Sequence, residues 1–248
     1  DISITLRSPE GEELATLTQN IDFAEGDSVK EMTFNFPAQA NAQLWSAETP
    51  VRYAFEISQK DAGTEEQAFV TRYGFVKVDI SKKYLEINNR RTYLRGMNAQ
   101  DTHPMHGRSI DVPMMIKDIT LMKQANVNAY RCSHYPRQAK MMAMFDYYGL
   151  YVMDEADMES HKNWTDGGVI RNAQSWEAAI VDREVRMVRR DRNHPSVIMW
   201  SLGNESTSGN NITAAYYAVR ALDPRPIHYE GSTRDYSFGT DIFSTMYR

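Results

Sequence analysis

The sequence predicts a multidomain β plus α/β chain, in which a partial immunoglobulin-like β-sandwich is followed by an incomplete (β/α)8 TIM barrel. Hydrophobic residues alternate with period two through residues 1–80, which places one set of side chains on one face of a sheet. From about residue 84, short apolar runs alternate with longer stretches of helical periodicity, as in βα units around a parallel sheet. We therefore expect the sandwich in residues 1–80 and the barrel in residues 81–248.

The strands of the sandwich are predicted from four alternating runs that are separated by turn residues. An immunoglobulin-like sandwich has about seven strands, and we count about four or five here, so we expect this domain to lack its beginning. The alternating residues are Ile2, Ile4 and Leu6; Met32, Phe34 and Phe36; Val51, Tyr53, Phe55 and Ile57; and Val76, Val78 and Ile80.

The barrel is predicted from short apolar strands with helices between them. A complete (β/α)8 barrel has eight strands in about 250 residues, whereas about 165 residues follow the sandwich here. We therefore expect roughly the first six strands. They are predicted at residues 93–98, 128–132, 150–153, 197–202, 227–229 and 242–245.

Three helices are predicted in the barrel region. One begins after the N-cap Asp111, with Pro113 in its first turn and apolar residues on one face. A second, around Met141 to Phe145, is expected to pack on the barrel. A third is predicted at residues 175–192, with an apolar face formed by Val181, Val185 and Val188.

Composition narrows the possible partners. The chain has 248 residues, 42% of them hydrophobic and 25% charged, as in ordinary globular proteins. The net charge of −5 gives no support for a nucleic-acid partner, and no apolar run has the length of a membrane span. The single cysteine, Cys132, excludes an intrachain disulfide and leaves the compartment open.

Polar residues collect at the ends of five successive predicted strands, at residues 98–103, 133–135, 154–161, 204–205 and 230. A solvated loop or a helix cap explains any one of these clusters. The carboxyl ends of barrel strands meet on one face, where barrel enzymes carry their active sites. The set of five clusters is therefore better explained by an active site.

Three stretches carry a resemblance to a known family. Residues 131–136 read Arg-Cys-Ser-His-Tyr-Pro, residues 148–156 end in Met-Asp-Glu-Ala, and residues 192–205 run from Arg-Asn-His-Pro to Leu-Gly-Asn-Glu. These stretches resemble β-galactosidases of glycoside hydrolase family 2, and residues 44–50 and 74–75 resemble the family's passage from sandwich to barrel. The resemblance implies a retaining exo-glycosidase that hydrolyses terminal β-D-galactosides.

The resemblance also implies residue roles. Glu205 would be the general acid/base, and its place at the end of an apolar strand suits this role, because desolvation raises the pKa of a carboxyl toward the operating pH. Asn204 would contact the sugar 2-hydroxyl, and His134 would face the sugar. Gln100 stands where the family carries a substrate-facing histidine.

A magnesium site is implied at Glu159 and His161, with Glu205 as a further ligand. Mg²⁺ prefers few carboxylates and several waters, which suits so sparse a set, although histidine is an uncommon ligand for a hard cation. A solvated loop is the alternative interpretation of residues 159–161.

The second carboxylate of a retaining glycosidase lies about 5–5.5 Å from the acid/base, and no residue of this sequence matches the family nucleophile. Glu155 and Glu230 match family acids without that role. We therefore expect the isolated chain to be inactive, and either unstable or associated through unpaired sheet edges. The full-length enzyme is expected to be a homo-oligomer, as family members often are.

Two other functions stay open. β-Glucuronidases and β-mannosidases of the same clan share the Asn-Glu motif, so either is an alternative to a β-galactosidase. A carbohydrate-binding module without catalytic activity is a third interpretation, and the missing nucleophile supports it. The presence of Glu205 argues against such a module, because a binder has no chemical need for a general acid.

Overall fold

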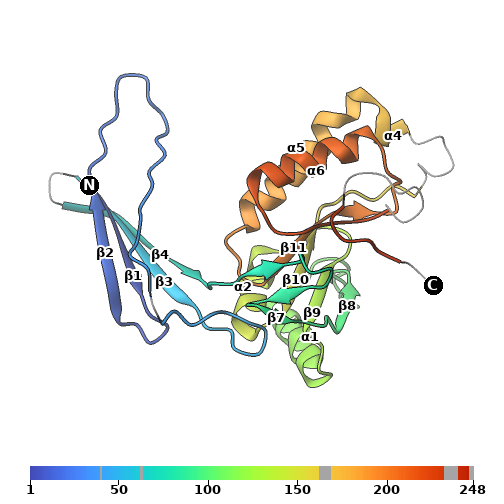
Figure 1. Ribbon diagram of the computed structural model, residues 1–248, viewed down its shortest axis with the longest axis horizontal. Helices are drawn as coiled ribbons and strands as arrows, with labels where there is room; N and C mark the ends of the chain where they lie inside the picture. Colours follow the sequence, from blue (N-terminus) through green and yellow to red (C-terminus); the bar gives the residue numbers. More distant parts are fainter. Residues whose placement is uncertain (40, 62–63, 162–168, 232–239, 246–248) are drawn as a thin grey trace. The chain divides into compact units, whose positions relative to one another are not determined.

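The structure is a computed structural model that describes residues 1–39, 41–61, 64–161, 169–231 and 240–245 (Figure 1). The chain divides into two compact units. The first contains residues 1–45 and 51–75, and the second contains residues 46–50 and 76–248. Each unit is described by itself below.

The first unit is built on a four-stranded antiparallel sheet with the order β2-β1-β3-β4. Its strands are β1 (Ile2–Arg7), β2 (Glu13–Gln19), β3 (Tyr53–Asp61) and β4 (Thr64–Tyr73). The predicted alternation holds in β1 and β3, where Ile4 lies opposite Ile57. Strands β2 and β4 were not among the predicted runs. Threonine and serine hydroxyls pair across β1 and β2, at Ser3–Thr18 and Thr5–Thr16, so this pairing is stabilised by polar contacts as well as by apolar ones.

The prediction of a strand at Met32, Phe34 and Phe36 is wrong. Residues 28–39 belong to no helix or strand, although the side chains of residues 31–37 do alternate between exposed and half-buried. The ring of Phe36 packs edge-on against Phe55 of β3, with 5.7 Å between the ring centroids. The alternation therefore records an extended segment with one side against other residues, without the backbone ladder of a strand.

The second unit begins with three short antiparallel strands, β5 (Val78–Asp79), β6 (Glu86–Ile87) and β7 (Arg90–Arg91). A five-stranded sheet follows, with the order β12-β11-β10-β9-β8 and every neighbouring pair parallel. Each strand lies beside the next one in the chain, as in a barrel. The strands are β8 (Gly96–Ala99), β9 (Ala129–Cys132), β10 (Tyr151–Glu155), β11 (Val197–Asn204) and β12 (Ile227–Glu230).

A sixth strand, predicted at residues 242–245, is absent from the part of the chain that the structure describes. A single parallel bridge between His228 and Ile242 stands in its place. Asp241 also contacts β12, because its carboxylate accepts a hydrogen bond of 2.7 Å from the backbone N–H of Ile227. The segment therefore follows the edge of β12 without forming a ladder.

The helices of this unit are α1 (Val112–Gln124), α2 (Ala139–Tyr148), α4 (Val169–Asn172), α5 (Gln174–Asp191) and α6 (Asn210–Leu222). The predicted cap of α1 is present, because the Asp111 carboxylate accepts a hydrogen bond of 3.0 Å from the backbone N–H of Met114. Helix α6 was not predicted. None of the described helices combines the length and hydropathy needed to cross a bilayer.

The predicted inner face of α5 is partly wrong. Val188 is buried as expected, whereas Val181 and Val185 are half-buried. The buried residues of this helix are Ile180, Glu184, Met187, Val188 and Asp191. Two carboxylates therefore occupy positions on the inner face that a hydrophobic pattern does not mark.

Strand β11 lies in the middle of the hydrophobic core, and all eight of its residues are buried. Apolar residues from its neighbours and from the helices pack around it, among them Cys132, Phe145, Val152, Val188, Ile212 and Tyr229. Burial on both sides of the sheet is typical of parallel sheets covered by helices. The strand that carries Asn204 at its end is thus held firmly along its whole length.

Candidate active site

The carboxyl ends of β9 to β12 lie around a cavity of about 380 Å³. Its lining includes His134, Glu159, His161, Asn204, Glu205 and Glu230. A second cavity, of about 390 Å³, is lined by Gln100 together with His134 and Glu159. All six predicted site residues thus line one or both of these two cavities, and His134 and Glu159 contribute to both.

A glycine makes the turn at the end of β11 possible. Gly203 has a φ of +128°, and a Cβ at this position would lie 2.2 Å from the carbonyl oxygen of Met158. This close approach lets the backbone N–H of Asn204 donate to the same carbonyl at 2.9 Å. The N–H of Glu205 donates to the carbonyl of Glu230 at 3.0 Å. The backbone of Asn204 and Glu205 is therefore tied to the neighbouring strand and loop.

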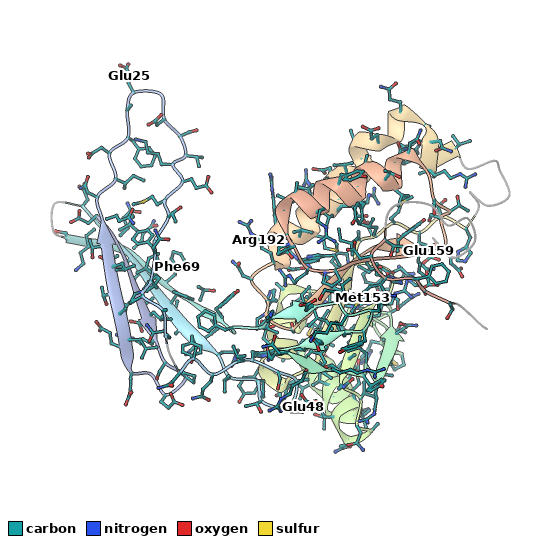
Figure 2. All side chains as sticks on the ribbon, in the orientation of Figure 1. Glu25, Glu48, Phe69, Met153, Glu159 and Arg192 are labelled. Carbon is teal, nitrogen blue, oxygen red and sulfur yellow. The ribbon has the colours of Figure 1, made fainter. Side chains whose placement is uncertain are left out.

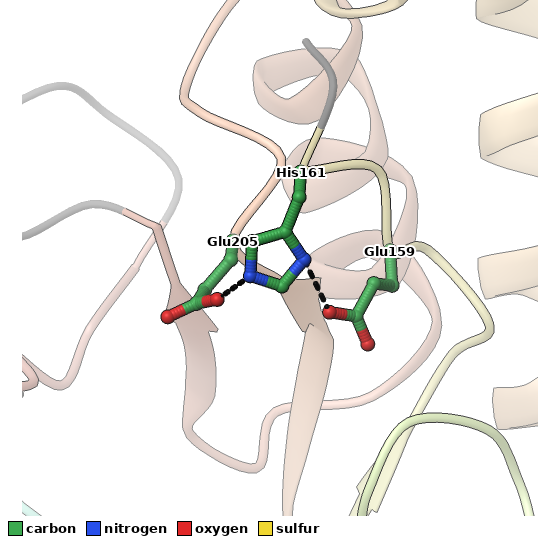
Figure 3. Close-up of side chains that lie close together, drawn as sticks. All are labelled: Glu159, His161 and Glu205. Atoms are coloured by element: carbon green, nitrogen blue, oxygen red, sulfur yellow. Dashed lines mark ion pairs between the residues drawn. The ribbon is translucent and has the colours of Figure 1, made fainter. Parts of the chain in front are cut away.

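Glu159, His161 and Glu205 form a compact cluster, and each offers one ligand atom within 4.8 Å of the others. The imidazole of His161 lies between the two carboxylates (Figure 3). Its Nδ1 is 2.9 Å from Oε1 of Glu159, and its Nε2 forms an ion pair with Glu205. Glu159 lies on the loop that follows β10, near the mouth of the barrel strands (Figure 2).

The same cluster suits a hard divalent cation. Each ligand atom of Mg²⁺ lies about 2.1 Å from the ion, so two ligand atoms of one ion are at most about 4.2 Å apart. The three ligand atoms of this cluster lie within 4.8 Å of one another, so small side-chain rotations bring them into range of one ion. Two carboxylates and a neutral imidazole leave several positions for water, as Mg²⁺ prefers. The three residues therefore fit the predicted metal.

Asn204 lies between a cation and an anion. Its Oδ1 accepts a hydrogen bond of 3.0 Å from Nη2 of Arg131, and its Nδ2 donates at 3.0 Å to Oε1 of Glu159. Arginine has no acceptor, so these two contacts fix which end of the amide is oxygen. The contact with Glu159 uses one of the two amide N–H groups, and Asn204 lines the first cavity.

Glu155, at the end of β10, is a residue whose role the sequence did not indicate. It is fully buried, and its carboxylate accepts hydrogen bonds from Arg131 at 2.7 Å and from Ser201 at 2.6 Å. Its other oxygen is 2.6 Å from Nδ1 of His134. Burial opposes ionisation, yet the hydrogen bonds from His134 and Arg131 hold the pKa of Glu155 below its ordinary value.

Glu155 and Glu230, the two acids without a family role, both accept hydrogen bonds from other side chains. Glu155 has no exposed surface from which to attack a sugar. Glu230 is buried, and its Oε2 lies 3.2 Å from Nε2 of His228 and accepts a further hydrogen bond from Ser244. The hydrogen bond from His228 lowers the pKa of Glu230 against the opposing effect of burial. Both carboxylates therefore serve as ionised partners within the wall of the site.

The chain matches two models of a known family. The model for glycosyl hydrolases family 2, TIM barrel domain, matches residues 78–248, and a second model for glycosyl hydrolases family 2 matches residues 1–75. Together with the strand order, these matches confirm the predicted fold class. They also agree with the predicted order of a sandwich followed by part of a barrel.

Solved structures with the same fold include three bacterial β-glucuronidases. The enzyme from Ruminococcus gnavus in complex with D-glucaro 1,5-lactone has a TM-score of 0.77 and 24% identity over 91% of this chain and 38% of its own. The Dictyoglomus thermophilum enzyme has a TM-score of 0.76 and 24% identity, over 92% and 39%. β-Glucuronidase 3 from Bacteroides uniformis has a TM-score of 0.72 and 23% identity, over 92% and 28%. The chain thus spans two fifths or less of their length, and at this identity the likeness shows the fold alone.

Proposed function

The chain belongs to glycoside hydrolase family 2, and from this premise we propose that it forms part of a retaining β-glycosidase whose general acid/base is Glu205. The observation that carries the proposal is the Asn204–Glu205 pair at the end of the fully buried β11, where both residues line a cavity with His134, Glu159 and His161. General acid/base groups act within hydrogen-bond reach of a positioned substrate, and a rigid strand end provides that positioning.

In the proposed reaction, the Glu205 carboxyl donates a proton to the glycosidic oxygen as the bond to the sugar breaks. The resulting carboxylate then takes a proton from the water that releases the sugar. Asn204 holds the 2-hydroxyl, a contact that strengthens as positive charge develops on the sugar ring. His134 and Gln100 are proposed to line the sugar site from the ends of β9 and β8.

The nucleophile is proposed to come from residues outside these 248. A retaining enzyme needs a second carboxylate about 5–5.5 Å from the first, and Glu155 and Glu230 are each held by other partners. The isolated chain is accordingly proposed to be inactive. A carbohydrate-binding module without turnover is the alternative that the missing nucleophile leaves open.

Magnesium is the proposed metal at Glu159, His161 and Glu205. Bound there, it would stabilise negative charge and order water beside the acid/base. For this chain's own residues, the proposal requires that a ring nitrogen of His161 exchange its contact with a carboxylate for a bond to the metal. The Asn204 amide would hold Glu159 in place by its hydrogen bond of 3.0 Å.

A terminal β-galactoside is the proposed substrate, on the strength of the sequence resemblance. The described part of the site supports a neutral sugar, because Glu159, Glu205 and Glu230 line the first cavity and its arginine, Arg131, is already paired with Glu155. A β-glucuronide is the second candidate, because the solved structures of similar fold are β-glucuronidases. A glucuronide would need a further cation for its carboxylate, and Arg108 of the second cavity is a described residue with that charge.

The test is hydrolysis by the full-length protein of aryl β-D-galactoside, β-D-glucuronide and β-D-mannoside in the presence of Mg²⁺. We expect the highest kcat/KM on the galactoside and little turnover by Glu205→Gln. Preference for the glucuronide would replace the galactoside by the second candidate. Saturable galactoside binding without turnover of any substrate would support the binding module and refute the enzyme.

A further inference from the structure

Glu155 connects the side chains that face the sugar, although it never reaches the cavity itself. We propose that Glu155 is a positioning residue, which fixes the Asn204 amide through Arg131 and fixes the His134 ring directly. The proposal rests on the glycosidase function above, because it assigns these two side chains to the sugar. Its physical basis is a fully buried carboxylate with three side-chain donors at 2.6 to 2.7 Å.

The first arm runs from Glu155 through Arg131 to Asn204. Oε2 of Glu155 accepts from Nε of Arg131 at 2.7 Å, and Nη2 of the same guanidinium donates to Oδ1 of Asn204 at 3.0 Å. A guanidinium is planar, so holding one edge on the carboxylate fixes the direction of the other. The amide oxygen of Asn204 is thereby occupied, and Asn204 meets the sugar 2-hydroxyl as a hydrogen-bond donor.

The second arm is the contact of 2.6 Å between Oε1 of Glu155 and Nδ1 of His134. An ionised carboxylate accepts hydrogen bonds only, so Nδ1 carries the proton in this contact. The other ring nitrogen, Nε2, lies 3.5 Å from Glu159 at the point where the two cavities adjoin. Glu155 thus sets both the ring orientation and the nitrogen that the sugar meets.

The third donor ties Glu155 to the next two strands. Ser201 of β11 donates to Oε2 of Glu155 at 2.6 Å, and its Oγ lies 3.0 Å from Nδ1 of His228 in β12. The carboxylate of one residue therefore fixes side chains from three neighbouring strands and from the loop that carries His134.

The decisive variant is Glu155→Gln in the full-length enzyme, assayed on an aryl β-galactoside and on its 2-deoxy analogue. We expect kcat on the galactoside to fall by about 10–100-fold, which is the effect of removing an outer-shell partner of a metal ligand. The change in KM should be smaller. The loss should be several-fold smaller on the 2-deoxy substrate, because that substrate has no oxygen for Asn204 to meet. Equal losses on the two substrates would overturn the proposal.

The control is Asp146→Asn, which changes a carboxylate–imidazole contact of the same 2.6 Å length at the opposite end of the strands. It should reduce stability and leave kcat within about twofold, because neither Asp146 nor its partner His194 is among the residues that line the two cavities. If Glu155→Gln does not fold, Ser201→Ala removes one donor and leaves the carboxylate in place. It should then lower kcat in the same substrate-dependent way by about threefold, the effect of one modest hydrogen bond, and an unchanged kcat would overturn the proposal.

A crystal structure of Glu155→Gln separates this proposal from the proposed function. We expect the Arg131 guanidinium, the Asn204 amide or the His134 ring to take a new orientation in the variant. Unchanged orientations would refute positioning by Glu155, even in a protein that hydrolyses no glycoside. Failure of the wild-type enzyme on every glycoside, with the side chains moved in the variant, would refute only the function.

Discussion

The two ends of the parallel sheet use the same bond for different purposes. At the carboxyl end, the Glu155 carboxylate and the His134 imidazole are 2.6 Å apart, and the far nitrogen of the ring adjoins two cavities. At the amino end, Asp146 and His194 are also 2.6 Å apart, but Asp146 additionally accepts the backbone N–H of Ser196 at 3.1 Å. The Glu155–His134 pair orients a side chain toward the cavities, whereas the Asp146–His194 pair is joined to the backbone of the sheet.

Arginines differ between the two ends in the same way. Arg225 at the amino end donates to Asp223 and to the backbone carbonyls of Arg192 and Val197, at 2.7 to 2.8 Å. Arg131 at the carboxyl end donates instead to the side chains of Glu155 and Asn204. Polar groups joined to backbone hold strands together, whereas polar groups joined to side chains set the geometry of a site. This difference predicts that variants at one end change rate and that variants at the other change stability.

The largest effect is expected for Glu205→Gln at the carboxyl end. Loss of a general acid/base should lower kcat on an aryl β-galactoside by about 10²–10⁴-fold in the full-length enzyme. The free energy of unfolding should change by less than about 1 kcal/mol, because the change is isosteric and the side chain borders the cavity. A kinetic assay and urea unfolding of the same preparation measure both quantities, and a large loss of stability would contradict the division between the two ends.

At the amino end, Asp223→Ala should destabilise the fold by about 3 kcal/mol, since it leaves the half-buried Arg225 without its carboxylate. It also removes the acceptor of the Trp200 indole N–H, which lies 3.1 Å from Oδ1 of Asp223. The pKa of Asp223, which burial would raise, is lowered by the hydrogen bonds and charge of Arg225, so the carboxylate is ionised in the fold. Urea unfolding should show the loss, and a changed kcat at a temperature where the variant is folded would count against the comparison.

Metal affinity gives a third measurement at the carboxyl end. His161→Ala should weaken Mg²⁺ binding by roughly 100-fold, since outer-shell partners alone change metal affinity by about 10–100-fold. Calorimetric titration of Mg²⁺ into the full-length enzyme measures the change. His106→Ala is the matched control, because His106 is an exposed histidine outside the Glu159–His161–Glu205 cluster. Unaltered Mg²⁺ affinity in His161→Ala would remove the proposed metal from this cluster.

The smallest effect is a pH dependence at the amino end. Burial disfavours the charged ring of His194, but the hydrogen bond and charge of Asp146 raise its pKa above the ordinary 6.5. The pair therefore stabilises the fold fully below pH 6.5, and this stabilisation is lost as pH rises through the raised pKa. Asp146→Asn should remove about 1 kcal/mol at pH 6 and less at pH 9. Unfolding free energies of both proteins at the two pH values measure this, and an equal loss at both would be contrary to the linkage.

The sequence predicted the elements whose stability depends on apolar burial. Strand β11 and the cap at Asp111 could be predicted because their signals are local. The inner face of α5 could not, since Glu184 and Asp191 are buried there. Burial raises the pKa of the Glu184 carboxyl well above its ordinary value, because desolvation disfavours its charged form. A hydrophobic pattern counts such a residue as polar and places it on the outside.

The residues of the candidate site could be named from the sequence, whereas the contacts between them could not. Glu205, Asn204, His134, Glu159 and His161 carry recognisable motifs, and the structure places them around one cavity. The role of Glu155 depends on which residues lie beside it, and those come from different strands that meet only in the folded sheet. The available signal was an acidic residue, Glu155, at the end of a strand that begins with the apolar residues Tyr151 to Met153. It does not say which partners neutralise the charge.

The complete burial of β11 has a consequence for how the enzyme would fail on heating. Segments that open before the rest of a protein have few buried contacts and exposed backbone hydrogen bonds. Strand β11 has neither property, because all eight of its residues are buried and its ladders run to β10 and β12 on either side. Its amide protons should exchange with solvent only through global unfolding. Opening of β11 should therefore coincide with the melting of the barrel and not precede it.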